Sequence, residues 1–265
     1  MDSKLVASGI PVYIDGDGPD TIVMLHGWPD THEIWEQQVQ HFKTTHRCVR
    51  FTLPGFDDPE TRGFSVSEIS KLILHVVDEV SPNVKVILML HDWGCLFGFH
   101  FAALHAHKVE RIVAIDVGDA SSPAFVRGLS LRAKLMIFAY QMPLALTWYM
   151  QGAVGNYLAR AIARFLRCKT DESSVHAGMS YPYAMRWMGA LGGLKVLAGP
   201  TQLKCPIFYA YGRYKPFQFQ SQEWLQKLNA NTSCKTALFK SSHWVMVDCA
   251  ESFNSSVSEW LSLNN

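Results

Sequence analysis

The feature that most constrains this chain is a very short turn between a buried strand and a buried helix. Residues 84–89 form an apolar, β-branched run of strand length, and residues 95–104 form an apolar run of helix length. The turn between them holds one side chain, Asp92, at the carboxyl edge of a sheet. An aspartate there suits attack on saturated carbon through an ester, as in epoxide opening or halide displacement. The alternative is that Asp92 only caps the helix.

Strands and helices alternate on both sides of this turn. Because such alternation packs as a mostly parallel sheet covered on both faces, the sequence predicts an α/β fold. Strands are expected at residues 9–15, 21–25, 47–53, 84–89, 111–116, 206–211 and 236–239, and helices at 34–42, 67–80, 95–104, 221–228 and 250–263. A chain of 265 residues is long enough for one such domain with an insertion.

The alternation stops at residues 117–198, which are rich in Met, Trp, Tyr and Leu. We expect this segment to be a helical lid inserted into a core domain formed by residues 1–116 and 199–265. Its apolar run is shorter than the ~20 residues that a membrane-spanning helix requires, and it contains Gln141 and Pro143. A lid that closes an apolar pocket is the expected use of these side chains.

The composition narrows the classes of function. A net charge of +1 and the lack of basic runs argue against a nucleic-acid-binding surface. Six cysteines without a CxxC pair, after an N-terminus that does not resemble a signal peptide, predict reduced thiols and a cytoplasmic location. The eleven histidines do not form an HExxH motif, so we expect neither a metal nor another cofactor.

Three motifs follow strands in a fixed order along the chain. They are HGWP at residues 26–29, HDWG at 91–94 and SHW at 242–244. With the PGF turn at 54–56, they resemble the α/β-hydrolase family, in particular its epoxide hydrolases and its haloalkane or haloacid dehalogenases. The resemblance covers nearly the whole chain and is weakest in the lid. It implies the α/β-hydrolase fold, a mostly parallel sheet flanked by helices with an inserted helical lid, and a hydrolase without a cofactor.

The resemblance implies a role for each motif. Asp92 would be the nucleophile that forms an alkyl-enzyme ester, and His243 would deprotonate the water that hydrolyses this ester. The backbone N–H groups of Trp28 and Trp93 would hold the oxyanion formed in that step. His26, in contrast, is expected to be a buried residue that shapes its loop.

The acid that orients His243 is missing from the place where many relatives keep it. Residues 211–216, at the end of the strand that follows the lid, read YGRYKP and contain no carboxylate. Other branches, including dehalogenases, place this acid at the end of the strand before the lid. Asp116 occupies that place here, and Asp119 is the second choice. For Asp116 the alternative role is that of a helix cap or loop anchor.

Two departures from the family, and two lid tyrosines, bear on the substrate. Leu90 occupies the elbow position where Gly is usual, and its side chain is expected to crowd the turn. Residues 94–97 lack the arginine pair of fluoroacetate-type dehalogenases, so a small carboxylate substrate is not expected. Tyr140 and Tyr183 lie in segments that resemble those whose tyrosines donate hydrogen bonds to an epoxide oxygen. Core packing is the alternative for each of them.

The sequence therefore predicts hydrolysis of a small apolar epoxide to a diol. A haloalkane dehalogenase is the closest alternative, with the same Asp92 and His243 and with the indole N–H of Trp93 on the halide, a second, unspecified Trp being a further candidate donor. The tyrosines favour the epoxide, and the lack of an acid after the strand that follows the lid favours the halide. A ligand-binding protein with weak or no turnover is the alternative from another class, since fold does not fix function. A serine esterase is excluded because the elbow carries Asp. The oligomeric state is not predicted.

Overall fold

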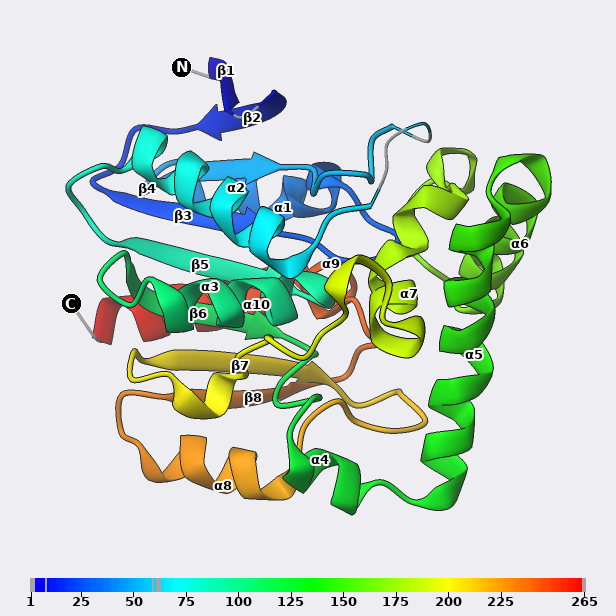
Figure 1. The fold of residues 1–265 in the computed structure, drawn as a ribbon. Coiled ribbons are helices and arrows are strands. Elements are labelled where there is room, and N and C mark those ends of the chain that lie inside the picture. The colour runs from blue at the N-terminus through cyan, green and yellow to red at the C-terminus, as the bar shows by residue number, and fades with distance from the viewer. Residues whose placement is uncertain (1–2, 8, 59, 61–62, 264–265) are drawn as a thin grey trace.

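The computed structural model describes residues 3–7, 9–58, 60 and 63–263. Its centre is an eight-stranded sheet in the order β1-β2-β4-β3-β5-β6-β7-β8 (Figure 1). Pairing is antiparallel between β1, β2 and β4 and parallel elsewhere, as the predicted α/β-hydrolase fold requires. The strands are β1 (Ser3–Ala7), β2 (Ile10–Asp15), β3 (Asp20–Leu25), β4 (His46–Phe51), β5 (Val86–His91), β6 (Val109–Ile115), β7 (Ile207–Gly212) and β8 (Lys235–Phe239). The sequence analysis missed β1, a short strand at the edge of the sheet.

Side-chain alternation along each strand divides the hydrophobic core between the two faces of the sheet. In β3, Val23 and Leu25 belong to one cluster, whereas Ile22 and Met24 belong to the other. Helices α2 (Val66–Val80), α3 (Trp93–Leu104) and α8 (Gln222–Ala230) contribute to the first cluster, and α1 (Glu36–Phe42), α9 (Val245–Asp248) and α10 (Ala250–Leu263) to the second. Because both faces are covered, the central strand β5 is buried along its whole length.

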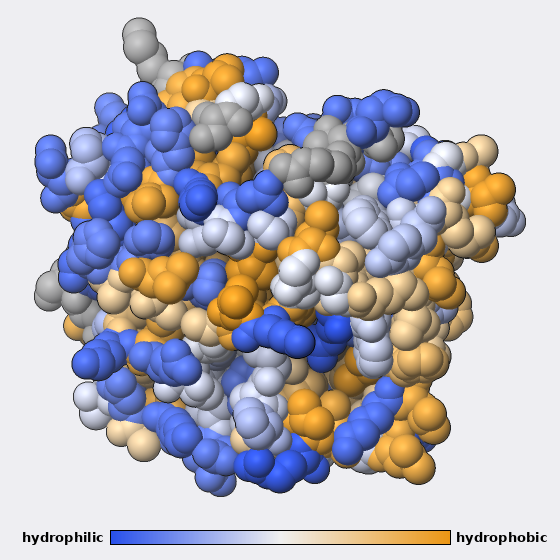
Figure 2. Space-filling model, viewed as in Figure 1, coloured by the Kyte–Doolittle hydropathy of each residue, from blue (hydrophilic) through white to orange (hydrophobic). Residues whose placement is uncertain are grey.

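The chain between β6 and β7 is helical, and no strand lies within residues 116–206. This segment, which we call the cap, consists of α4 (Pro123–Gly128), α5 (Leu131–Met150), α6 (Gly152–Phe165), α7 (Tyr181–Met188) and the short 3₁₀ turns η2 (Glu172–Ser174), η3 (Ala177–Ser180), η4 (Ala190–Gly192) and η5 (Pro200–Gln202). Helix α7 lies between α5 and the sheet, and α5 and α6 form the outer edge of the molecule (Figure 1). Hydrophobic side chains gather along that edge in Figure 2.

The longest cap helix, α5, follows from identifiable local signals. Ser130 precedes it, and the Ser130 hydroxyl accepts a hydrogen bond from the Ala133 N–H. The helix ends where Gln151 adopts a φ of 44°. α5 is 20 residues long and includes the apolar run discussed above. Among the described residues no helix is long and apolar enough to cross a membrane.

Candidate active site

The elbow after β5 presents Asp92 as the turn predicts. Asp92 has a φ of 53° and a ψ of −120°, a conformation that costs free energy for any residue with a side chain. Its side chain makes no capping hydrogen bond to α3, so the alternative of a simple helix cap is wrong. Instead, Asp92 Oδ1 accepts a hydrogen bond of 2.9 Å from the backbone N–H of Trp28. The HGWP loop thus lies directly against the tip of the elbow.

Close packing at the elbow explains why Gly27 and Gly98 lack a side chain, and it contradicts the expectation that Leu90 crowds the turn. A Cβ at Gly27 would collide with the Asp92 side chain, so only glycine lets the HGWP loop approach so closely. Leu90 does not crowd the turn. Its side chain fills the space that a Cβ at Gly98, in the following helix, would occupy. The side chain missing at Gly98 therefore compensates for the one added at Leu90.

His243 lies between two carboxylates. It follows β8, and its ring Nε2 is 3.3 Å from Asp92 Oδ2. Its Nδ1 is 2.5 Å from Asp116 Oδ2, on the side of the ring that faces away from Asp92. Asp116 directly follows β6 and has a φ of 67°, so both acids occupy strained positions at strand ends. The carboxyl edge of the parallel sheet brings the three residues together.

Asp119, the second choice for the acid, lies elsewhere. Its carboxylate accepts hydrogen bonds from the backbone N–H and the hydroxyl of Ser221, each 2.6 Å long, and from the Ser122 hydroxyl. Ser122 and Ser221 in turn cap α4 and α8. Asp119 is therefore an anchor between two helix starts, the role that was the alternative for Asp116.

A lysine that the sequence analysis did not single out completes the surroundings of Asp116. Lys215 Nζ is 2.5 Å from Asp116 Oδ1, and the side chain of Lys215 is only 6% exposed. The backbone N–H of Gly212 donates to the same oxygen at 2.9 Å. Both donors lie in the segment where many relatives carry the acid. Here this segment supplies a cation to the acid at the end of β6. The sequence signal for this contact was that YGRYKP carries basic residues where many relatives carry an acid.

These contacts shift the pKa values of the three groups. Burial lowers the pKa of His243, but the charges and hydrogen bonds of Asp116 and Asp92 outweigh it and raise that pKa to about 9. For both aspartates burial opposes ionisation. The contacts with His243 nevertheless lower the pKa of Asp92, and Lys215 together with His243 lowers that of Asp116. Two carboxylates thus flank an imidazole that holds its proton firmly in this state.

Two tyrosines from the cap cover the elbow. The ring of Tyr183, on α7, meets the rings of Trp28 and Trp93 edge to face, with centroid distances of 5.7 and 5.2 Å. Tyr140, on α5, lies 6.4 Å from the Tyr183 ring. Burial, and then the charge of Asp92, raise the pKa of Tyr183 well above its usual value. Both hydroxyls, whose pKa values burial raises, therefore stay protonated near the carboxylate.

The hydroxyl of Tyr140 is held in one orientation. The indole N–H of Trp187, which can only donate, lies 3.0 Å from Gln141 Oε1. This contact turns the amide nitrogen of Gln141 toward Tyr140, whose oxygen accepts a hydrogen bond of 2.7 Å from it. Because the Tyr140 oxygen is an acceptor in this bond, its own proton is free to be donated to another group.

Comparison with known proteins identifies the family of this chain. Residues 22–255 match the alpha/beta hydrolase family. The chain belongs to this family. Epoxide hydrolase 2 of Caenorhabditis elegans is 29% identical over 114 residues, which are 40% of this chain and 31% of that protein. Cis-3-alkyl-4-alkyloxetan-2-one decarboxylase of Shewanella oneidensis is 25% identical over 116 residues, 42% of this chain and 36% of the relative. The chain thus aligns with about a third of the length of each.

Solved structures show the same fold over nearly the whole chain. A mutant of an epoxide hydrolase from Bacillus megaterium, complexed with its diol product, has a TM-score of 0.74 and 18% identity. The match covers 98% of this chain and 100% of that one. At this level of identity the likeness establishes the α/β-hydrolase fold and leaves the substrate to be argued from the site itself.

A buried polar network supports the back of the site in this α/β hydrolase. Asp30 is fully buried, accepts a hydrogen bond of 2.9 Å from the indole N–H of Trp244, and lies 3.5 Å from Nδ1 of His91. The His91 ring packs 4.5 Å from that of His243. Asp30 also accepts a hydrogen bond of 2.5 Å from Thr170 of the cap. The network fixes the loop that carries His243 and ties the cap to the core.

His26 has the structural role that the sequence predicts. Its Nε2 accepts a hydrogen bond of 2.8 Å from the backbone N–H of Leu53, and its Nδ1 lies 3.0 Å from the carbonyl of Gly27. Burial lowers the pKa of His26 to about 4, so the ring is neutral at pH 7. His26 therefore joins the HGWP loop to the end of β4.

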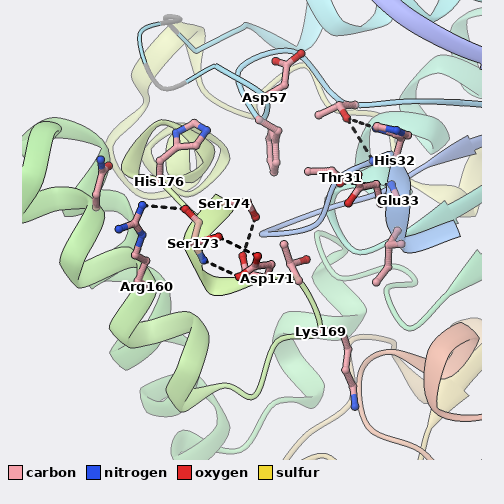
Figure 3. A pocket seen from close by; sticks show the side chains of 15 residues that line it. Thr31, His32, Glu33, Asp57, Arg160, Lys169, Asp171, Ser173, Ser174 and His176 are labelled. Carbon is pink, nitrogen blue, oxygen red and sulfur yellow. Dashed lines mark hydrogen bonds between the residues drawn. The ribbon is translucent and has the colours of Figure 1, made fainter. Parts of the chain in front are cut away.

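A separate cleft of about 600 Å³ lies where the cap meets the core (Figure 3). Thr31, His32 and Glu33 line it from the core, and Arg160 and His176 from the cap. Most of the residues that line it are polar, and none of the candidate site residues is among them. Among the described residues no group of three or more His, Cys, Asp or Glu side chains is arranged to hold a metal ion.

Proposed function

We propose that this α/β hydrolase converts an apolar epoxide to a diol through an ester on Asp92. One arrangement carries the proposal. One oxygen of Asp92 accepts a hydrogen bond from the Trp28 N–H, the other faces His243, and two protonated tyrosines cover the carboxylate. The likeness to proteins named epoxide hydrolases supports the same reaction.

The first step opens the epoxide. An oxygen of Asp92 attacks one epoxide carbon, and the bond between that carbon and the epoxide oxygen breaks. The developing alkoxide needs a proton donor, which Tyr183 or Tyr140 supplies. The product is an ester on Asp92 with a neighbouring hydroxyl group. The apolar rings of Trp28 and Trp93, which pack against Tyr183, suit an apolar substituent.

The second step hydrolyses the ester. His243 first gives its resting proton to the tyrosinate left by epoxide opening. It then takes a proton from water, and the hydroxide attacks the Asp92 carbonyl carbon. The N–H groups of Trp28 and Trp93 hold the resulting oxyanion. Collapse breaks the bond between this carbon and the alkyl oxygen, and the leaving alkoxide takes the proton from His243. The new carboxyl group of Asp92 returns its proton to His243, so epoxide and water leave as diol and the resting charges are restored.

A haloalkane dehalogenase is the second candidate, and one observation favours it. The indole nitrogen of Trp28 is buried and has no hydrogen-bond partner among the described residues. An unused N–H on the residue whose backbone N–H binds Asp92 is the kind of group that binds a departing halide. The nucleophile and the base are the same in both reactions. The two reactions therefore differ in the mass of the group that the ester intermediate adds to Asp92.

The test is to trap the ester. His243→Gln should block the second step, so that intact-mass measurement shows an adduct on Asp92 after exposure to substrate. An adduct of the full mass of the epoxide supports the proposal, and one of the alkyl mass of a haloalkane supports the second candidate. A substituted oxetan-2-one belongs in the same panel because of the named decarboxylase relative. His41→Gln, at an exposed histidine that pairs with Ser258, is the control and should accumulate no adduct.

The control experiment for the site is Asp92→Ala in the same panel. Because this variant lacks the attacking carboxylate, no adduct should form with any substrate. Turnover by wild type without an adduct in His243→Gln would falsify the assignment of Asp92. Binding of epoxides without turnover by wild type would instead support the ligand-binding alternative.

A further inference from the structure

The outer side of the cap is unusually apolar. Of the nineteen large hydrophobic side chains exposed in the described part of the chain, ten lie on α5 and α6. These two helices contain only 20 and 14 residues. We call these ten side chains the cap outer face: Leu131, Leu135, Phe138, Leu146, Tyr149, Met150, Val154, Tyr157, Leu158 and Phe165. Figure 2 shows the hydrophobic band that runs along this edge.

The arrangement differs from that of an ordinary surface helix. A surface helix normally turns polar residues to solvent and apolar residues to the core. In α5 the buried row includes Ile137 and Leu144, yet the opposite row is also apolar, with Leu135 and Phe138 exposed by 59% and 46%. A contiguous apolar surface of this kind marks a site of interaction.

The charges carried by α5 and α6 themselves have one sign. Residues 123–170 contain no Asp or Glu, although the whole chain carries a net charge of only +1. The seven basic residues of the segment are Arg127, Arg132, Lys134, Arg160, Arg164, Arg167 and Lys169. Arg164 pairs with Glu172 and Lys169 with Asp248. Within the described residues Arg132, Lys134 and Arg167 form no ion pair and are exposed.

We propose that the cap outer face docks on the surface of an anionic lipid membrane. The apolar side chains would enter the boundary between head groups and acyl chains, and the unpaired basic residues would meet anionic head groups. A second copy of the chain suits this face less well, because two such faces would bring like charges together. Nucleic acid would satisfy the charges but leave the apolar row uncovered.

Docking of this kind adds a function to the cap that is independent of the reaction at Asp92. An apolar substrate concentrates in lipid, so an enzyme held at the membrane surface meets it where it is most abundant. The inward side of the cap would then serve the elbow, and the outward side would serve the membrane.

The experiment is flotation of the purified protein with lipid vesicles, with and without phosphatidylserine in phosphatidylcholine. We expect binding to the anionic vesicles that weakens as salt screens the charges. Arg132→Gln with Lys134→Gln should weaken it by ~30-fold, because each basic residue near such a surface contributes about 1 kcal/mol of binding free energy. Leu135→Gln with Phe138→Gln should weaken it by ~10²-fold through lost apolar burial.

Matched controls carry the same changes elsewhere. Leu104→Gln with Leu238→Gln alters two hydrophobic side chains that are equally exposed outside the cap. Lys71→Gln with Lys85→Gln removes two exposed lysines of the core domain. Both controls should bind vesicles as wild type does, and unchanged thermal unfolding shows that every variant is folded.

Three results would overturn the proposal. Wild type that does not float with anionic vesicles has no such docking surface. Equal losses in the cap variants and their controls would mean that general charge and hydrophobicity explain the binding. A stable dimer in solution that Leu135→Gln with Phe138→Gln converts to a monomer would assign the face to a second copy.

Discussion

The sheet and the cap hold their candidate functional groups in different ways. Asp92 and Asp116 sit at strand ends with positive φ angles, and each carboxylate accepts a hydrogen bond from a backbone N–H. Tyr140 and Tyr183 project from helices and are held by ring contacts and by one glutamine amide. The backbone of the sheet thus fixes the acids, whereas side-chain packing fixes the cap tyrosines.

This difference suggests a division of labour under the proposed mechanism. The sheet would supply the steps common to epoxides and haloalkanes, namely ester formation and ester hydrolysis. The cap would supply the proton that only an epoxide needs. Changes in the sheet should therefore affect both substrate types, and changes in the cap should affect the epoxide alone.

The largest effect is expected at Asp116. Asp116→Asn leaves Nδ1 of His243 without its carboxylate partner, so we expect kcat to fall by ~10⁴-fold on both epoxide and haloalkane. The change also leaves Lys215 buried without a counter-charge, which should lower the thermal unfolding temperature. Steady-state kinetics and calorimetry measure the two effects.

A double variant separates these effects at Asp116. Asp116→Asn with Lys215→Met removes the unpaired cation, so it should recover much of the lost stability while kcat stays low. Recovery of kcat together with stability would show that Asp116 acts only as a structural anchor.

A smaller effect, confined to one substrate type, is expected at Tyr183. Tyr183→Phe removes one donor to the developing alkoxide, so epoxide turnover should fall by ~10²–10³-fold. Halide displacement should change little, because a departing halide needs no proton. Tyr140→Phe, measured in parallel, shows which hydroxyl is the main donor. Equal losses on both substrates would mean that Tyr183 only shapes the pocket, and the contrast between sheet and cap would fail.

Gln141 should have a still smaller effect. Gln141→Leu removes the donor that orients Tyr140, and the loss of one hydrogen bond predicts about a tenfold decrease in epoxide turnover. Gln141→Glu is a sharper test, because its carboxylate would accept the Tyr140 proton and compete with the epoxide oxygen. Glu should therefore impair turnover more than Leu. The opposite order would show that the orientation of Tyr140 does not matter.

The smallest change in rate, but a definite change in pH dependence, is expected for Lys215. Asp116, Asp92 and the ring of His91 surround His243, and Lys215 offsets the charge of Asp116. Lys215→Met removes this cation, so the imidazolium is favoured and the pKa of His243 rises. Because neutral His243 is the proposed base, the rate of ester hydrolysis, followed in single turnovers, should reach half its maximum at higher pH than in wild type.

The free energy of unfolding should also depend on the protonation of His243. The pKa of His243 in the folded protein, about 9, lies above its ordinary value of 6.5. Its contribution to stability is therefore complete below pH 6.5 and lost as the pH rises through about 9. Lys227→Met, at an exposed lysine paired with Glu223, should leave both profiles unchanged.

The sequence predicts the sheet better than it predicts the cap, for a physical reason. Strands buried on both faces must be apolar, and a residue that directly follows such a strand must lie at the sheet edge. Asp92, Asp116 and His243 each follow a buried or partly buried strand, so their neighbourhood could be inferred from the order of elements. β1 escaped prediction because a short edge strand buries little and carries no such pattern.

Contacts that depend on side-chain packing were not predictable in this way. No spacing rule links Lys215 to Asp116 or Gly98 to Leu90, since each pair forms only when separate elements pack together. The apolar row on the outside of α5 is visible in the sequence, but its exposure to solvent is not. In the sequence it is indistinguishable from the row that faces the core, so only the structure reveals which side lacks a cover.

The ion pair between Lys215 and Asp116 has a consequence for the order of events at the site. In the resting state two carboxylates, a protonated imidazole and an ammonium group sum to no net charge. Formation of the ester on Asp92 would move its negative charge to the tyrosine that protonates the epoxide oxygen. The imidazolium would then face only Asp116, whose charge Lys215 already offsets. Transfer of the His243 proton to the tyrosinate would neutralise both groups. Alkylation would thus itself convert the imidazolium into the base that the next step requires, and the buried lysine would favour this proton transfer.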